Sequence, residues 1–304
     1  SSLSYPEQRP KSAVNAIAQA CAVPPENLLL GNGSTELFSA ALLSVRPSRA
    51  IFAGPCYSGY EDVCRTLDLD FEYRICAGKE ESFRFDLGRM KLKKGDFVFI
   101  CTPNNPTGRL IPKKEILQFV SRFGNIFFGV DESFMDYHSN PQDESLIDRK
   151  MPENIIVFKS LTKFFGIAGL RLGMLCASPS NIKTIGGKLL PWNVNSIAQG
   201  IAPLLYSDKN YICEIRKKYI SARSLFSKAL SEYPLNIFPS SANFLLCELK
   251  NGKAGGASAS RFQKYLLERG FLIRNCSKIA GLDENFFRAA VLDEESNSRI
   301  ADAM

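Results

Sequence analysis

The sequence has very little histidine, and this scarcity limits the chemistry open to it. His138 is the only histidine among 304 residues, and it falls in the polar segment 136–141, where we predict a solvated loop residue. A single histidine excludes metal sites built from several histidines and argues against a histidine-based catalytic triad. No run of eighteen apolar residues is present, so we expect no membrane span. Residues 1–6 do not have the pattern of a signal peptide.

Cysteine spacing, charge and glycine patterns exclude further classes of site. The nine cysteines are scattered and never spaced as Cys-x-x-Cys, which indicates reduced, mostly buried thiols and a cytoplasmic protein. The net charge of +7 is compatible with a small anionic substrate, and no basic run with interleaved aromatics predicts nucleic-acid binding. Segment 31–36 lacks the third glycine of a dinucleotide fingerprint, and segment 186–189 does not complete a phosphate-binding loop.

What the sequence does contain is an alternation of short apolar strands and amphipathic helices. Strand-like runs occur at 28–30, 51–53, 97–101, 125–130, 155–158 and 171–177, with helical spacing in several of the intervals. This order predicts an α/β fold, with a mostly parallel sheet covered by helices on both faces. Residues 71–94 are weakly patterned, and we predict one strand and one helix there.

The C-terminal third predicts a second, smaller unit. A long amphipathic helix pattern from about 205 to 232 is the natural bridge, so the expected domains are 1–206 and 207–304. Within the second domain we predict a small α+β unit, with strands at 243–249 and 270–274, a helix at 257–269 and a turn across 252–260.

Lys163 is the strongest candidate for chemistry. It follows the apolar run 155–158 and is therefore expected at the carboxyl end of a strand, where open α/β sheets bind ligands. Apolar neighbours at 164–170 would partly desolvate the amine, which favours the neutral, nucleophilic form that makes an imine. Ser160 and Arg171 suit a phosphate group. The alternative interpretation of this stretch alone is a surface lysine beside a strand.

A glycine turn at 31–33 leads into a helix pattern and forms a second candidate. We predict Ser34 or Thr35 as the N-cap, so that bare amide groups and the positive helix end face one point, as in an anion site. An ordinary strand-to-helix turn is the alternative. Tyr57 follows the strand at 51–53 and is suited to stacking on a flat heterocycle, although a core or rim tyrosine fits the pattern equally well.

Two further polar residues follow predicted strands. Asp131 abruptly ends an apolar strand, which is costly unless the carboxylate has a cationic partner or a strong donor; an N-cap is the alternative. Asn105 lies in the turn 102–108, after another strand. Because parallel strands bring their carboxyl ends to one edge, we expect Asn105, Asp131 and Lys163 to converge.

Together these residues resemble a known family. Asn105 in Asn-Asn-Pro-Thr-Gly, Asp131 after an apolar strand, and Ser160-x-x-Lys163 with Arg171 eight residues later resemble the fold-type I pyridoxal-phosphate enzymes. The resemblance covers nearly the whole chain, and within the family it is closest to the threonine-phosphate decarboxylases of the cobalamin pathway, relatives of the histidinol-phosphate aminotransferases. Segments 4–6, 31–33, 191–195, 273–276 and 281–288 also carry it.

The resemblance implies pyridoxal 5'-phosphate as the cofactor. Lys163 would hold the cofactor aldehyde as an internal aldimine and later move protons, Asp131 would keep the pyridine nitrogen protonated, and Asn105 would donate to the ring hydroxyl. Tyr57 would stack on the ring. The implied ligands of the cofactor phosphate are Ser160, Arg171 and the amides of Gly33, Ser34 and Thr35.

The resemblance also implies the substrate contacts and the assembly. Arg288 would bind the substrate α-carboxylate, and Arg274 is the better of two candidates for a phosphate on the substrate. Tyr5 would reach the cofactor phosphate of a neighbouring subunit, so the active unit would be a homodimer. The partners expected are therefore a small anionic amino acid and a second copy of the chain.

The sequence departs from the family pattern in two places, and the second of them bears on the reaction. The family has a substrate-contacting segment ahead of the equivalent of Tyr5, and this sequence lacks it. Aminotransferases of the group usually have tyrosine three residues after the aspartate, where this sequence has Phe134, and decarboxylases accommodate phenylalanine there. The resemblance thus implies decarboxylation of L-threonine O-3-phosphate to (R)-1-amino-2-propanol O-2-phosphate. A histidinol-phosphate-type aminotransferase and the cofactor-sensing domain of a transcriptional regulator remain as alternatives.

Overall fold

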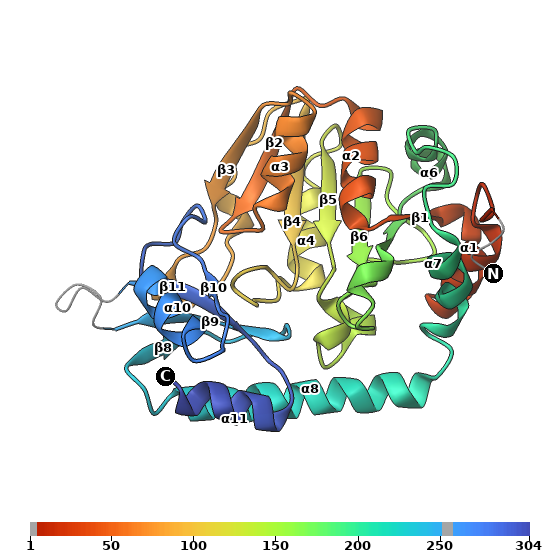
Figure 1. Cartoon of the computed structure of the whole chain (residues 1–304). Helices are drawn as coiled ribbons and strands as arrows, with labels where there is room; N and C mark the ends of the chain where they lie inside the picture. The colour runs from red at the N-terminus through yellow and green to blue at the C-terminus, as the bar shows by residue number, and fades with distance from the viewer. Residues whose placement is uncertain (1–4, 251–257) are drawn as a thin grey trace.

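A seven-stranded sheet forms the centre of the molecule (Figure 1). The structure is a computed structural model that describes residues 5–250 and 258–304. The strand order is β1-β7-β6-β5-β4-β2-β3, and β7 alone runs antiparallel to its neighbours in this sheet. The strands are β1 Leu28–Asn32, β2 Arg49–Gly54, β3 Phe71–Ile75, β4 Asp96–Cys101, β5 Phe127–Asp131, β6 Ile155–Ser160 and β7 Leu172–Cys176. The predicted mostly parallel α/β sheet is confirmed.

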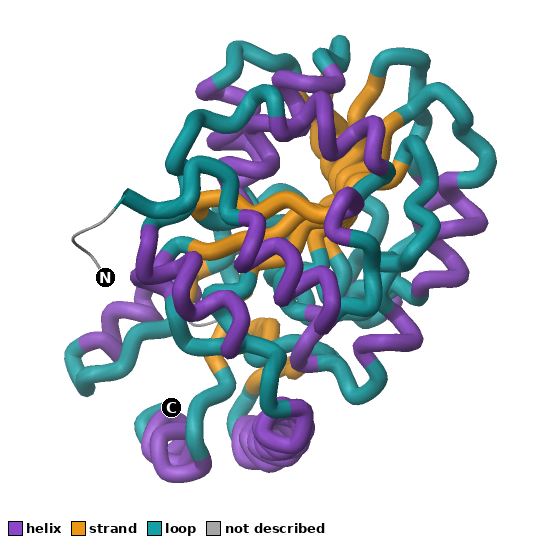
Figure 2. Tube along the Cα trace, turned by 90° about the vertical axis from the view of Figure 1, so that its right-hand side faces the viewer, coloured by secondary structure: helices purple, strands orange, loops and turns teal. Residues whose placement is uncertain are grey.

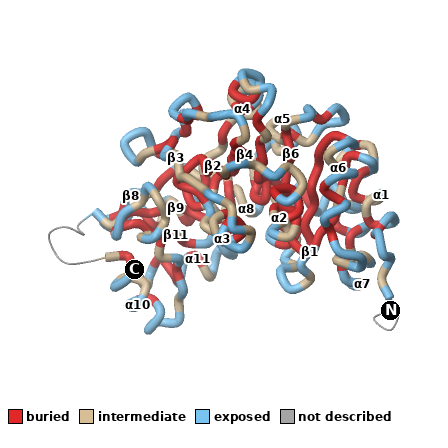
Figure 3. Tube along the Cα trace, turned by 90° about the horizontal axis from the view of Figure 1, so that it is seen from above, coloured by how far each residue is buried: buried red, intermediate tan, exposed pale blue. Residues whose placement is uncertain are grey.

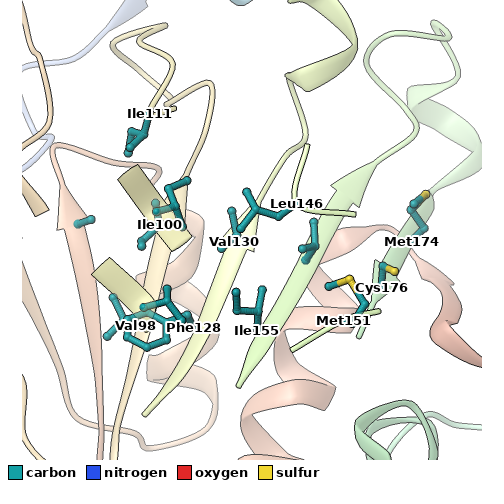
Figure 4. Close-up of a cluster of buried hydrophobic side chains, with 14 of the residues drawn as sticks. Val98, Ile100, Ile111, Phe128, Val130, Leu146, Met151, Ile155, Met174 and Cys176 are labelled. Atoms are coloured by element: carbon teal, nitrogen blue, oxygen red, sulfur yellow. The ribbon is translucent and has the colours of Figure 1, made fainter. Parts of the chain in front are cut away.

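The central strands are buried and mostly apolar because both faces of the sheet are covered. Every residue of β4 and β6 is buried, and Figure 3 shows buried segments along the strands with exposed segments outside them. Side chains alternate between two clusters: Val98 and Ile100 point to one face, where Figure 4 shows them with Phe128 and Val130. Phe97 and Phe99, from the same strand, belong to the cluster on the other face.

Helices cover the sheet on each side. Helices α2 and α3 pack on the face that carries Phe99, and α4 packs on the face that carries Val98. The α-helices in residues 5–250 and 258–304 are α1 Lys11–Ala20, α2 Ser34–Val45, α3 Gly59–Thr66, α4 Lys113–Val120, α5 Pro141–Glu144, α6 Pro179–Gly186, α7 Ser196–Ile201, α8 Lys209–Leu230, α10 Ala259–Leu267 and α11 Glu294–Asp302. None of the helices in the described ranges is long and apolar enough to cross a membrane.

A second sheet lies beside the first, below β3 in the view of Figure 1. It is antiparallel, in the order β10-β11-β9-β8, with strands β8 Leu235–Ile237, β9 Phe244–Leu249, β10 Arg274–Asn275 and β11 Phe286–Ala290. Helix α8 runs under both sheets, and α11 packs against it; Figure 2 shows these two helices end-on. The second sheet has its own apolar cluster. The domain boundary at 206 and 207 stays a prediction.

Several expected elements differ in the structure. Residues 71–94 form β3 and two short 3-10 turns, Lys79–Glu81 and Leu87–Arg89, in place of the predicted helix. The strand predicted at 270–274 is only Arg274–Asn275, and β11 was not predicted, because an arginine interrupts its short apolar run. The turn predicted across 252–260 falls mostly on residues outside the described ranges.

The cysteines match the sequence prediction, whereas His138 matches it only in part. All nine cysteines are free, and all but Cys21 and Cys213 are buried. His138 follows a 3-10 turn as a loop residue, but it is half-buried rather than solvated, and its Nδ1 accepts a hydrogen bond from the Asn140 amide. Burial lowers the pKa of His138.

A buried polar network fixes the segment that follows β5. Lys159 Nζ donates to Asp136 Oδ1 at 2.8 Å, and both side chains are less than one tenth exposed. The Tyr206 hydroxyl and the Arg216 Nε donate to the same aspartate, to its carboxylate and its carbonyl oxygen respectively. These bonds tie α8 and the chain ahead of it to the main sheet. Removal of one partner of such a buried pair typically costs about 3–5 kcal/mol.

Glu132, next to Asp131, is also buried in this region, and its burial should make the stability of the protein depend on pH. Its oxygens accept hydrogen bonds from the Ser145 hydroxyl and the Leu146 amide, and burial raises its pKa to about 7. A carboxyl with a raised pKa binds its proton more tightly in the folded chain. Its contribution to stability is therefore fully present below pH 4.5, the ordinary value, and is lost as the pH rises through 7.

We therefore expect Glu132→Gln to remove this pH dependence, since the amide does not titrate, keeps the shape, and can accept from the Leu146 amide while its NH2 group donates to the Ser145 hydroxyl. Urea unfolding of both proteins from pH 4.5 to 8 measures the effect. The wild type should lose unfolding free energy relative to the variant as the pH rises through this window. Parallel curves would show that folding does not raise the pKa of Glu132.

Candidate active site

The carboxyl ends of β4, β5 and β6 open into a cavity of about 590 Å³ that is lined by residues of both sheets. This volume is within the range of pockets that hold cofactors and small substrates. Ten of the twelve predicted site residues line it: Ser34, Thr35, Tyr57, Asn105, Asp131, Ser160, Lys163, Arg171, Arg274 and Arg288. The expected convergence of Asn105, Asp131 and Lys163 is therefore present in the structure.

The two other predicted residues, Gly33 and Tyr5, lie outside the cavity lining. Gly33 is in contact with a residue of the site, because a Cβ atom added there would lie 2.5 Å from Arg171 Nη2. Tyr5 is 87% exposed and packs against Trp192, with 5.8 Å between the ring centroids. Its predicted contact with a neighbouring subunit stays a prediction.

One end of the cavity is formed by the start of α2. The predicted N-cap at Ser34 or Thr35 is wrong: Gly33 is the N-cap, with φ +80°, and its amide donates to the Gly31 carbonyl. The left-handed conformation, which glycine adopts easily, turns the chain so tightly that Ser34 is already helical. No side chain caps this helix, so amide groups of its first turn remain available to an anion.

Other phosphate-type ligands lie at the same end. The Ser160 and Thr162 hydroxyl oxygens are 2.8 Å apart, and both line the cavity with Arg171. Arg171 has no acidic partner within 4.0 Å in the described part of the chain. Uncapped amides, hydroxyls and an unpaired arginine together suit an anion with several oxygens.

Asp131, at the end of β5, is held by two donors. Its side chain is 5% exposed; Tyr60 donates to Oδ2 at 2.7 Å, and the Ser133 amide donates to Oδ1 at 2.9 Å. The prediction of a strong donor is confirmed. Burial and the neighbouring Asp131 raise the pKa of Tyr60 well above its usual range, so the phenol stays a donor. Sequence reasoning missed Tyr60, because nothing in segment 54–60 distinguishes it from Tyr57.

Lys163 lies where its amine faces the cavity. Desolvation lowers its pKa; Asp131 and Cys101 oppose the shift, while Arg171 and Arg288 add to it. This agrees with the predicted desolvation of the amine, although the Lys163 residue as a whole is exposed, through the cavity. Its Nζ is 5.5 Å from the centroid of the Phe134 ring, which is 6% exposed. The arrangement favours a neutral, nucleophilic amine.

Two arginines stand at the other end of the cavity. Arg288 on β11 and Arg274 on β10 are directly opposite in the antiparallel register, where like charges repel. Neither has an acidic partner within 4.0 Å among the described residues. Arg288 Nη1 instead donates to Asn105 Oδ1 at 2.5 Å. Burial, and to a smaller degree Arg274, lower the pKa of Arg288. An anionic ligand would relieve this repulsion.

Comparisons with known proteins agree with this geometry. The sequence model of the family "Aminotransferase class I and II" matches residues 2–304. The chain is 34% identical over 309 aligned residues to the adenosylcobalamin biosynthesis bifunctional protein CobDQ of Leptospira interrogans; the match covers 99% of this chain but only 35% of that longer protein. It is 31% identical to a histidinol-phosphate aminotransferase of Caldanaerobacter subterraneus, covering 99% of this chain and 83% of the relative.

A solved structure gives the same result. The L-threonine-O-3-phosphate decarboxylase of Porphyromonas gingivalis superposes with a TM-score of 0.85 at 27% identity, covering 99% of this chain and 89% of that one. The family match, the sequence identity and the shared fold agree over nearly the whole chain. The chain therefore belongs to the class I and II aminotransferase family, whose members are pyridoxal-phosphate-dependent enzymes.

Proposed function

We propose that the protein decarboxylates L-threonine O-3-phosphate to (R)-1-amino-2-propanol O-2-phosphate and carbon dioxide. The observation that carries the proposal is the facing pair Arg274 and Arg288 at one end of the cavity, two cations with no acidic partner within 4.0 Å in the described chain. Threonine phosphate has two anionic groups, a carboxylate and a phosphate, and one could bind at each arginine. The relative in adenosylcobalamin biosynthesis and the superposed decarboxylase support this substrate.

The residues present fit pyridoxal 5'-phosphate. The free amides of α2, with Ser160 and Arg171, would hold its phosphate, and Lys163 would hold its aldehyde. A carboxylate has about four acceptor sites, and Asp131 uses two in the structure, which leaves capacity for the pyridine nitrogen. When bound, the cofactor supplies an electron sink for charge that develops at the substrate Cα. Tyr57 would stack on its ring, and Asn105 would donate to its ring hydroxyl.

In this proposal the chain's own residues orient the substrate and move protons. Arg288 would bind the α-carboxylate, and Arg274 would bind the substrate phosphate, so that the two anchors fix the direction of the bond that breaks. Lys163, whose pKa is lowered by desolvation, is suited to return a proton to Cα. Tyr5 of a second copy would complete the phosphate site in a homodimer.

Phe134 favours decarboxylation over amino transfer. The aminotransferases that the sequence resembles usually have a tyrosine there, and Phe134 lines the cavity close to Lys163 without a hydroxyl. The rival proposal is a histidinol-phosphate-type aminotransferase, and the Caldanaerobacter relative favours it. Histidinol phosphate, the amino donor of that reaction, has no carboxylate. Arg288 would therefore have no carboxylate to bind while the amino group is removed from the donor.

One assay separates the two proposals. The cofactor-loaded protein is mixed with threonine phosphate, with and without 2-oxoglutarate, and carbon dioxide and glutamate are followed together. We expect carbon dioxide at the same rate in both mixtures and no glutamate. Stoichiometric glutamate without carbon dioxide would establish the aminotransferase and refute the decarboxylase.

For Arg288→Ala we expect kcat/KM for threonine phosphate to fall about 10- to 100-fold, since hydrogen bonds to charged groups contribute about 1.5–3 kcal/mol. Stability should change little, because no buried carboxylate loses its partner. Arg269→Ala, which removes an exposed arginine outside the cavity lining, is the matched control. Equal kinetics for the two variants would remove Arg288 from the substrate site.

For Phe134→Tyr we expect the bound cofactor to lose its yellow colour at a pH about one unit lower than in the wild type. The added phenol would be a second donor beside Asn105 to the ring oxygen; it would stabilise the anionic oxygen and so weaken proton binding at the adjacent Lys163 nitrogen. A spectrophotometric pH titration without substrate measures this. Phe165→Tyr, outside the cavity lining, is the control. The same midpoint for wild type and Phe134→Tyr would show that residue 134 is remote from the ring oxygen.

A further inference from the structure

The surroundings of Arg288 point to a residue that no sequence motif identified. Its guanidinium has two close neighbours: Asn105 Oδ1 at 2.5 Å and the Phe244 ring, whose centroid is 4.6 Å from Arg288 Cζ. Within the described residues, no carboxylate oxygen lies within 4.0 Å of the Arg288 guanidinium nitrogens. A guanidinium over an aromatic face at this separation is held by cation–π attraction, which is strongest where water is excluded.

The register of the second sheet explains why this contact forms. Arg288 on β11 is directly opposite Leu246 on β9, and Phe244 is two residues earlier on β9. Phe244 is therefore the diagonal cross-strand neighbour of Arg288 on the same face of the sheet, within reach of a long side chain. Phe244 is 3% exposed, so its ring has little freedom to move away from the guanidinium.

Phe244 is held in turn by the main sheet. Its ring meets the Phe134 ring edge to face, with 5.0 Å between centroids and an interplanar angle of 88°. Phe134 is also the ring next to Lys163 Nζ. One aromatic pair thus connects the end of β5 with the arginine of the second sheet. The direction of Arg288 is determined by contacts from two separate parts of the chain.

We propose that Phe244 is a positioning residue, whose ring face holds the Arg288 guanidinium so that its free N–H groups bind the substrate α-carboxylate in one orientation. The inference rests on the proposed role of Arg288, and it assigns to Phe244 the selection of carboxylate-bearing ligands. With Phe244 removed, Arg288 keeps its bond to Asn105 but can rotate toward water. Ligands with a carboxylate should lose affinity, and ligands without one should not.

The experiment compares two ligands that differ in that group. Threonine phosphate has the carboxylate, and 1-amino-2-propanol O-2-phosphate has the same amine and phosphate without it. The cofactor-loaded variants are Phe244→Leu and Phe244→Met, which keep an apolar side chain without a ring, and Phe244→Tyr, which keeps the ring. Phe287→Leu, a buried phenylalanine of β11 outside the cavity lining, is the matched control. KM for the first ligand and the competitive inhibition constant for the second are measured.

We expect Phe244→Leu and Phe244→Met to raise KM about five- to tenfold with the inhibition constant unchanged. Phe244→Tyr and Phe287→Leu should keep the wild-type ratio of the two constants. An equal rise in both constants, or no rise in either, would overturn the proposal and leave Phe244 as a packing residue.

The outcome is separable from that of the proposed function. If the wild type does not turn over threonine phosphate, the proposed function fails, and calorimetric dissociation constants for the same two ligands replace the kinetic ones. A selective loss of the carboxylate-bearing ligand in Phe244→Leu then still supports the role of Phe244. Turnover by the wild type with an unchanged ratio in Phe244→Leu refutes only the role of Phe244.

Discussion

A carboxylate buried at the end of a strand is the constraint on which the rest of the site depends. Asp131 is nearly inaccessible to water, and its negative charge is tolerated because Tyr60 and the Ser133 amide donate to it. Tyr60 reaches the Asp131 carboxylate from α3, and its ring stacks on the Phe99 ring of β4 with 4.9 Å between the ring centroids. The packing of that helix on the sheet therefore also fixes the direction of the carboxylate.

The two ends of the cavity are formed by different parts of the fold. The main sheet and the start of α2 provide Ser34, Ser160 and Arg171, where we propose that a phosphate binds, and the second sheet provides Arg274 and Arg288. Asn105, in the loop after β4, connects the main sheet with the second sheet, because its side-chain oxygen accepts a hydrogen bond from Arg288. A small motion between the sheets would change the distance between the ends, so contacts between them, such as Phe134 with Phe244, affect the geometry of a bound substrate.

The main features were predictable from the sequence because they are local. Apolar runs ending in a polar residue indicate parallel strands, and they placed Asn105, Asp131 and Lys163 at one edge. The features that were missed depend on contacts distant in sequence. Tyr60 reaches Asp131 from 71 residues away, and the interrupted strand β11 is stabilised by pairing with β9 and β10 rather than by its own pattern. The cap at Gly33 required backbone geometry that residue types alone do not specify.

The central claim is that Lys163 binds the cofactor aldehyde covalently. The most direct test is to load the protein with pyridoxal 5'-phosphate, reduce it with borohydride, digest it and locate the phosphopyridoxyl group by mass spectrometry. We predict one modified residue, Lys163, and no modification in Lys163→Ala loaded and reduced in the same way. Modification of a different lysine in the wild type, or unchanged labelling of the Lys163→Ala protein, would contradict the assignment of this cavity as the active site.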